Sequence, residues 1–259
     1  MGIKTVILCG GKGSRLREET EVRPKPMVEI GGMPILWHIM KTYAAYGFND
    51  FVLCLGYKGE MIKEYFYNYE MLSNDFTIEL GTRNITVYPR HSEKGWKVTL
   101  ADTGQEAMTG ARVKRIEKYI DTDTFMLTYG DGVADINIKE LIEFHRSHGR
   151  IGTVTGVVPP SRYGELALSG DHVTGFTEKP EDGRAAISGG YFVFNRKMLE
   201  YLDDSDGCVF EKEPLRTLAG KEQLKVFEHK GFWQCMDTYR DYAFLKQLWE
   251  KGDAPWKKW

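Results

Sequence analysis

Short apolar runs alternate with amphipathic segments through most of this 259-residue chain. Residues 5–8, 51–55, 125–129 and 151–158 are brief and rich in β-branched or aromatic residues, which is typical of strands covered on both faces. The segments from Pro34, 138–148 and 239–250 repeat apolar residues every three or four positions, which predicts helices that pack on a sheet. Strands joined through helices pair in parallel, so the pattern predicts an α/β fold with a mainly parallel mixed sheet flanked by helices.

Two stretches interrupt this pattern. Residues 74–100 are polar and contain short alternating pieces at 76–80 and 85–88, which predict a β-hairpin inserted between core elements. Such an arm either covers the substrate or pairs with another subunit, and its aromatic residues favour contact over free solvation. Of the two, we expect a contact within an oligomer. After Pro159 and Pro160, residues 162–166 and 173–177 predict a small second sheet.

The first strand runs into a glycine-rich, cationic loop that has the features of a phosphate-binding site. Gly10, Gly11 and Gly13 let backbone N–H groups converge on an anion. Arg15 adds a forked donor for phosphate oxygens. Lys25 stands between two prolines, so its ammonium is held on a stiffened segment.

Two better-known glycine motifs do not match this loop. A P-loop requires Ser or Thr after its lysine, but Lys12 is followed by Gly13. The dinucleotide-binding fingerprint requires Gly or Ala where Leu16 stands. The loop therefore belongs to neither class.

Candidate metal ligands follow two other predicted strands. Asp131 comes directly after the strand at 125–129, between two glycines, and the carboxyl edge of an open α/β sheet is where ligands bind. Asp237 precedes the last helix, which either it or Thr238 can cap, so capping is the alternative role for Asp237. Thr109 and Gly110 likewise resemble a helix cap, with Arg112 close behind them.

Composition narrows the possible partners. The net charge of −2, without a dense basic block, argues against nucleic-acid binding. No apolar run reaches the length of a membrane span and no signal peptide precedes the first strand, so we expect a cytoplasmic protein without membrane contact. We interpret the four scattered cysteines and His38 as packing residues, and His145 and His148 as a solvated helix end.

The motifs together resemble the sugar-1-phosphate nucleotidyltransferases, and within that family the glucose-1-phosphate cytidylyltransferases. The matching runs are G-G-K-G-S-R-L, R-P-K-P-M-V-E-I-G-G, T-Y-G-D-G-V-A-D, E-K-P, G-F-W-Q and M-D-T, and the likeness covers essentially the whole chain. The resemblance implies a Rossmann-like nucleotidyltransferase fold, Mg²⁺, and a homo-oligomer, either trimer or hexamer. It also implies that CTP and glucose 1-phosphate are converted to CDP-glucose and pyrophosphate.

The resemblance further implies a role for individual residues. The implied catalytic residues are Arg15, Lys25 and Asp131, and the implied metal ligands are Asp131 and Asp237. The implied nucleotide contacts are Leu8, Cys9, Gly10, Gly11, Gly13, Ser14, Arg15, Lys25, Thr109, Gly110, Arg112 and Gly130. The implied sugar-phosphate contacts are Tyr129, Gly164, Glu178, Lys179, Ser188 and Gly189. Cys9 and Ser188 depart from the family pattern, where Ala and Asn are common.

We therefore expect one domain over residues 1–259. Its nucleotide-binding half spans 1–135 and carries the hairpin insertion at about 74–100, and its sugar-binding half spans 136–259 and ends in the last helix. Two alternatives remain at this point. One is a relative that uses a different sugar 1-phosphate or nucleotide, and the other is a non-catalytic sugar-nucleotide-binding protein.

Overall fold

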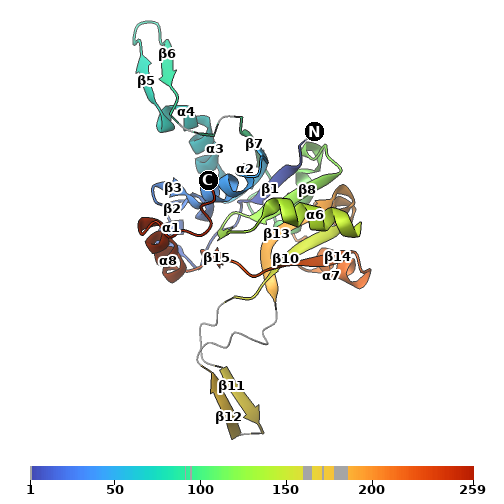
Figure 1. Cartoon of the computed structure of the whole chain (residues 1–259). Helices are drawn as coiled ribbons and strands as arrows, with labels where there is room; N and C mark the ends of the chain where they lie inside the picture. Colours follow the sequence, from blue (N-terminus) through green and yellow to red (C-terminus); the bar gives the residue numbers. More distant parts are fainter. Residues whose placement is uncertain (1, 91, 94, 160–164, 171, 178–185) are drawn as a thin grey trace.

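The central sheet collects strands from the whole length of the chain. The computed structural model describes residues 2–90, 92–93, 95–159, 165–170, 172–177 and 186–259. Within these residues, seven strands pair in the order β14-β10-β13-β8-β1-β4-β7 (Figure 1). In chain order they are β1 (Lys4–Leu8), β4 (Asp50–Leu55), β7 (Lys97–Asp102), β8 (Thr124–Tyr129), β10 (Gly152–Val157), β13 (Ile187–Asn195) and β14 (Leu224–His229). Neighbours are parallel except for β13, which runs antiparallel to β8 and β10, so the predicted mixed, mainly parallel sheet is confirmed.

Alternating side chains give this sheet two apolar faces. Ile7 and Leu53 belong to one buried cluster, whereas Val6 and Leu127 belong to the other. The first face is covered by α2 (Ile35–Ala44), α3 (Gly59–Tyr67), α6 (Ile138–His148) and α8 (Tyr239–Glu250). The second face is covered by α5 (Thr109–Arg115), η3 (Arg196–Tyr201) and α7 (Glu213–Gly220). Burial on both faces explains why the strands are continuous apolar runs in the sequence.

The ends of two predicted helices are fixed by local hydrogen bonds. The Asn137 side chain accepts from the backbone N–H groups of Lys139 and Glu140 at the start of α6, and Gly149 ends that helix with a φ of +64°. At the start of α8, Thr238 and Asp241 form a reciprocal capping box. Thr238 is thus the cap, and the alternative role considered for Asp237 does not apply.

The predicted arm is present but shorter than expected. β5 (Asp75–Ile78) and β6 (Ile85–Tyr88) form a hairpin that projects from the body next to α4 (Tyr69–Ser73) (Figure 1). The prediction that the arm continues to residue 100 is wrong, because residues 97–102 form β7 and pair with β4. β7 is an edge strand and alternates polar and apolar residues, as a solvent-exposed hairpin does. The sequence pattern therefore does not distinguish β7 from the strands of the arm.

Small elements complete the chain. The predicted second sheet is confirmed as the antiparallel pair β11 (Glu165–Ser169) and β12 (His172–Thr177). The pair β9 (Gly132–Ala134) and β15 (Trp233–Cys235) lies beside the central sheet, and β2 (Glu29–Ile30) pairs with β3 (Met33–Pro34). The remaining short helices are α1 (Arg17–Thr20), η1 (Lys25–Met27) and η2 (Glu117–Tyr119).

The packing predictions have mixed outcomes. Trp256 is fully buried, so the C-terminal tail docks on the body. The four cysteines are unpaired, and Cys9, Cys54, Cys208 and His38 are buried, as packing residues would be. Cys235 is half-buried and donates to Asp237 Oδ2, so the packing role predicted for it does not hold. The solvated role predicted for His145 is wrong, because His145 is buried and shares the Thr153 hydroxyl with His148. Among the described residues, none of the helices has the length and apolar character needed to traverse a lipid bilayer.

Candidate active site

The loop after β1 folds back over the carboxyl edge of the sheet. The Cys9 N–H donates to the Cys54 carbonyl (3.0 Å), which continues the pairing with β4 past the end of the strand. Gly13 then adopts a φ of +62°, and a Cβ there would lie 2.8 Å from the Thr20 methyl. The Leu16 N–H closes the turn by donating to the Gly13 carbonyl (3.0 Å). Glycine at position 13 is therefore required by both backbone conformation and space.

A second loop brings Asp131 and Asp237 together. The Met236 N–H donates to the Asp131 carbonyl (2.8 Å), which extends the β9–β15 pairing toward the two aspartates. Lys25 Nζ donates to Asp131 Oδ2 (2.8 Å) and to Asp237 Oδ1 (2.6 Å). Arg15 Nη1 lies 3.0 Å from Asp237 Oδ2. Two carboxylates that are 106 positions apart in the sequence thus face one ammonium group beside the glycine loop.

The charges of this cluster hold each other in their ionised forms. Burial alone would lower the pKa of Lys25, but attraction to Asp131 and Asp237 and the hydrogen bonds to both raise it above its ordinary value. Burial alone would raise the pKa of Asp237, but Lys25 and Arg15 together lower it. The Cys9 thiol is different: burial, followed by the nearby Cys54 and Asp131, raises its pKa, so Cys9 is not a thiolate nucleophile.

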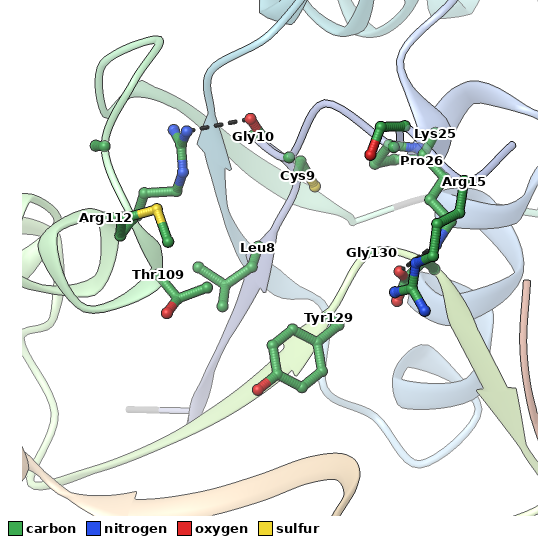
Figure 2. A pocket seen from close by; sticks show the side chains of 16 residues that line it. Leu8, Cys9, Gly10, Arg15, Lys25, Pro26, Thr109, Arg112, Tyr129 and Gly130 are labelled. Carbon is green, nitrogen blue, oxygen red and sulfur yellow. Dashed lines mark hydrogen bonds and ion pairs between the residues drawn. The ribbon is translucent and has the colours of Figure 1, made fainter. Parts of the chain in front are cut away.

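A pocket of about 340 Å³ opens between the glycine loop, the end of β8 and the start of α5 (Figure 2). Figure 2 shows Arg112, Thr109 and Leu8 on one side, Arg15, Lys25 and Gly130 on the other, with Tyr129 between them. The pocket is lined by Leu8, Cys9, Gly10, Gly11, Gly13, Ser14, Arg15, Lys25, Pro26, Ala107, Met108, Thr109, Arg112, Tyr129, Gly130 and Asp131. This set contains every expected nucleotide contact except Gly110.

Gly110 and Thr109 face the loop that precedes α7. The Gly110 N–H donates to the Cys208 carbonyl (2.9 Å), and a Cβ on Gly110 would lie 2.5 Å from Cys208 Sγ. Thr109 Oγ1 donates to Glu211 Oε2 (2.6 Å) and accepts from the Phe210 N–H (3.0 Å). The expectation that Thr109 and Gly110 cap the helix is wrong, because a carbonyl of the facing loop satisfies the first N–H groups of α5 instead.

A smaller cavity of about 50 Å³ adjoins this pocket and shares Tyr129 and Asp131 with it. Its other lining residues are Thr128, Gly132, Ser188, Gly189, Gly190, Tyr191, Trp233 and Cys235. Trp233 Nε1 donates to the Gly189 carbonyl (2.7 Å), and Ser188 Oγ accepts from the Gly190 N–H (3.3 Å). Among the expected sugar-phosphate contacts, Tyr129, Ser188 and Gly189 thus meet in one place. Gly164, Glu178 and Lys179 lie outside the described residues.

Comparison with known proteins matches this architecture to one family. The family model described as nucleotidyl transferase covers residues 4–248. The chain belongs to the nucleotidyl transferase family. Its relatives include the glucose-1-phosphate cytidylyltransferase of Salmonella typhi, which is 52% identical over 99% of this chain and 100% of its own length. A probable glucose-1-phosphate cytidylyltransferase of Bacillus subtilis is 44% identical over the same shares.

A solved structure shares the fold of this chain. The crystal structure of HddC from Yersinia pseudotuberculosis superposes with a TM-score of 0.67 and 26% identity, covering 95% of this chain and 99% of that one. The predicted fold class is therefore confirmed at the level of the family as well as in the sheet order.

The acidic pair of this nucleotidyl transferase fits a magnesium ion. Mg²⁺ prefers oxygen ligands and commonly takes one or two protein carboxylates together with substrate phosphates and water. Asp131 and Asp237 offer two carboxylates that already converge on a cation, the Lys25 ammonium. Within the described residues no cluster of three or more His, Cys, Asp or Glu side chains is placed to hold a metal, so any metal here would draw its further ligands from phosphate and water.

The structure adds pocket residues of this nucleotidyl transferase that sequence reasoning missed. Pro26, Ala107 and Met108 line the larger pocket, and Trp233 and Tyr191 line the smaller one. Pro26 is the second proline of the Pro-Lys-Pro motif, and its place next to Lys25 could have identified it as a pocket residue. Trp233 lies 104 positions from Tyr129, and nothing in the local pattern links the two.

Proposed function

We propose that this nucleotidyl transferase transfers a cytidylyl group from CTP to α-D-glucose 1-phosphate, which gives CDP-glucose and pyrophosphate. The observation that carries the reaction type is the convergence of Lys25, Arg15, Asp131 and Asp237 beside a glycine loop in one pocket. The choice of CTP and glucose 1-phosphate rests on the 52% identity to a full-length relative of that name.

The proposed reaction needs no catalytic base. A phosphate monoester has a second pKa near ~6, so at neutral pH glucose 1-phosphate is already largely a dianionic nucleophile. The protein must instead bring two anions together, align the attack on the α-phosphorus with the departure of pyrophosphate, and neutralise the charge that grows on the leaving group. A pocket furnished with N–H donors, Arg15 and Lys25 suits this task better than a Ser/His/Asp arrangement would.

We assign the phosphate contacts by the charge and position of the side chains. Arg15 and the loop amides of Gly11 and Gly13 would hold the β and γ phosphates, and Lys25 would bind the α phosphate. Asp131 and Asp237 would hold Mg²⁺, which neutralises charge on the triphosphate when bound. Lys25 Nζ has three N–H donors and gives one each to Asp131 and Asp237, so it has the capacity for a further hydrogen bond to the α phosphate.

The sugar side of the proposal involves the smaller cavity and residues outside the described part of the chain. Tyr129, Ser188 and Gly189 border the cavity next to Asp131. We propose that Glu178 accepts sugar hydroxyls and that Lys179 orients the sugar phosphate, as their E-K-P motif indicates, and that Gly164 lies near the sugar. Ser188 has a shorter side chain than the Asn common in relatives, which changes one potential hydroxyl contact.

A substrate grid tests the proposal. Pyrophosphate release is measured with CTP, UTP, GTP, ATP and dTTP, each combined with the 1-phosphates of glucose, mannose and galactose. We expect the highest kcat/KM for CTP with glucose 1-phosphate. A higher value for another pair would overturn the substrate assignment while keeping the reaction type. No turnover with any pair would favour the non-catalytic binding protein.

A further inference from the structure

The carboxylate of Glu211 joins two walls of the larger pocket. Its Oε1 accepts from the Tyr129 hydroxyl at the end of β8 (2.5 Å), and its Oε2 accepts from the Thr109 hydroxyl at the start of α5 (2.6 Å). Both hydroxyl-bearing residues line the pocket, whereas Glu211 does not. The carboxylate therefore contacts the pocket walls from outside the pocket and is placed to control how their hydroxyl groups are oriented.

The loop that carries Glu211 is fixed to the start of α5 by backbone hydrogen bonds. The Met108 N–H donates to the Asp206 carbonyl (2.8 Å), and the Gly110 N–H donates to the Cys208 carbonyl (2.9 Å). Glu211 follows three residues after the second of these carbonyls. Although Glu211 is exposed to solvent, these main-chain contacts hold its backbone in a fixed place relative to the pocket.

The hydrogen bonds to Glu211 fix the direction of both hydroxyl protons. An ionised carboxylate can only accept, so Tyr129 and Thr109 must each point their proton toward it. Burial, together with the negative charge of Glu211, raises the pKa of Tyr129, so its hydroxyl keeps the proton that it donates. Thr109 Oγ1 also accepts from the Phe210 N–H (3.0 Å). What the Thr109 hydroxyl can still offer to a ligand is therefore a lone pair and no proton.

Thr109 lies across the pocket from the cations that suit a triphosphate. Figure 2 shows Thr109 on one side and Arg15 and Lys25 on the other. A nucleoside triphosphate whose phosphates meet those cations extends its nucleoside toward the Thr109 side of the pocket. The pyrimidine bases differ here in polarity, because cytosine carries an amino group that donates where uracil carries a carbonyl that accepts. An acceptor on the protein favours cytosine, and a donor favours uracil.

We propose that Glu211 is a positioning residue that sets the choice of nucleotide. It holds the Thr109 hydroxyl as an acceptor, so that the pocket prefers the amino group of cytosine over the carbonyl of uracil. Tyr129 occupies the second carboxylate oxygen and keeps the carboxylate from rotating away from Thr109. The inference rests on the proposed function, in that the nucleotide is CTP.

Glu211→Gln tests the inference without changing the size of the side chain. An amide has one accepting oxygen and one donating nitrogen, so it cannot accept from both hydroxyls. The phenol of Tyr129 is the more acidic hydroxyl and keeps the amide oxygen, so Thr109 must accept from the amide and turn its proton toward the pocket. We expect the ratio of kcat/KM for CTP to kcat/KM for UTP, measured by pyrophosphate release, to fall about tenfold or more, because one matched hydrogen bond becomes a mismatch. A merely structural role predicts that both values fall by the same factor, and that result or an unchanged ratio would overturn the inference.

Two further variants sharpen the test. In Tyr129→Phe with Glu211→Gln, the amide oxygen is free to accept from Thr109, so the ratio should return to that of Tyr129→Phe alone. A ratio that stays low in the double variant would contradict the inference. Glu213→Gln is the matched control, because it removes the same charge two positions away, at a residue that contacts Thr217 and does not line the pocket. If wild type itself does not prefer CTP to UTP, the proposed function fails and this inference with it, which is distinct from a wild-type preference that Glu211→Gln leaves intact.

Discussion

At the scale of single residues, the site is a balance of opposite charges. Lys25 occupies the point on which Asp131 and Asp237 converge, and Arg15 reaches the outer oxygen of Asp237. The arrangement keeps two carboxylates close together in the free protein, where their mutual repulsion would otherwise be unfavourable. The same residues can exchange partners when a metal and phosphates arrive.

Asp131→Asn tests whether Asp131 is a metal ligand. The substitution removes one negative charge but leaves Lys25 paired with Asp237, so the fold should persist with a Tm within a few degrees of wild type. We expect turnover to fall on the order of a hundredfold or more, because charge on the leaving group is less well neutralised. Asp253→Asn, an exposed aspartate outside the site, is the control. Near-normal turnover in Asp131→Asn would remove this residue from the metal role.

Lys25→Met tests whether the lysine ammonium and a metal compete for one place. Without the ammonium, two neighbouring carboxylates lose their counter-charge, so Mn²⁺ added in the absence of nucleotide should bind about tenfold more tightly or better. Turnover should nevertheless fall, since the α phosphate loses a cation. Titration followed by electron paramagnetic resonance measures the free Mn²⁺, with Lys246→Met on the exposed side of α8 as control. Weaker Mn²⁺ binding in Lys25→Met would show that the aspartates do not form the metal site.

At the scale of elements, the sequence predicts well the helices and loops that have local signals. It predicts poorly the elements that depend on partners distant in the sequence. The prediction of a helix at 138–148 is confirmed to the residue, and in the structure Asn137 and Gly149 fix its two ends. The phosphate loop carried its glycines and its Pro-Lys-Pro in one stretch. By contrast, β7 is distinguished from the arm only by its pairing with β4, and the approach of Asp237 to Asp131 depends on the β9–β15 pairing.

Arg112 illustrates the same limit within the site. Its place next to Thr109 indicates a donor for the ligand, and it lines the pocket. The sequence does not show that the guanidinium also donates to carbonyls that lie 57 and 102 positions away. The sequence shows that residue 112 is an arginine. Which carbonyls accept its hydrogen bonds depends on which strands are neighbours in the sheet. Local patterns therefore locate candidate residues, and topology decides what they contact.

The C-terminal tail and α2 form a unit with its own pH dependence. His38 Nε2 lies 2.8 Å from the Ile30 carbonyl, and Trp256 Nε1 donates to His38 Nδ1 (3.4 Å). The ring is thus neutral, with Nε2–H as donor and Nδ1 as acceptor. Burial lowers the pKa of His38 to about 4. Since the unfolded chain has an ordinary histidine pKa near ~6.5 and binds the proton more readily, the stabilisation is fully present above that value and is lost as the pH falls toward 4.

His38→Gln tests this assignment. Glutamine stays neutral at every pH, so the difference in unfolding free energy between wild type and variant should shrink by about 3 kcal/mol from pH 7 to pH 4. Denaturant unfolding at intervals of half a pH unit gives the two curves. Their difference cancels the titration of all other groups. Parallel curves would mean that His38 can accept a proton in the folded state.

At the scale of the whole molecule, the arm is the feature that a single chain leaves unexplained. Phe76, Ile78 and Ile85 are exposed on one face of the hairpin that projects from the body (Figure 1). A row of exposed apolar side chains is costly in water and is typical of an interface. We propose that the arm contacts another copy of this chain in a homo-oligomer, a trimer or a hexamer.

Substitution of the arm tests the proposed oligomer. Phe76→Asp with Ile78→Asp places two charges on the apolar row, so the mass measured by light scattering should shift toward that of the monomer. Val226→Asp on β14 is the control, because it adds a charge at a comparably exposed strand position away from the arm. An oligomer that persists in the arm variant would exclude the arm as its principal contact.

The central claim is that paired aspartates and a cationic glycine loop join two anionic substrates. The most direct measurement is the amount of CDP-glucose and pyrophosphate formed from CTP, glucose 1-phosphate and Mg²⁺, separated by anion-exchange chromatography. Wild type should yield the two products in equal amounts, and the double variant Asp131→Asn, Asp237→Asn should yield neither above background. Product formation by the double variant at the wild-type rate would contradict the account.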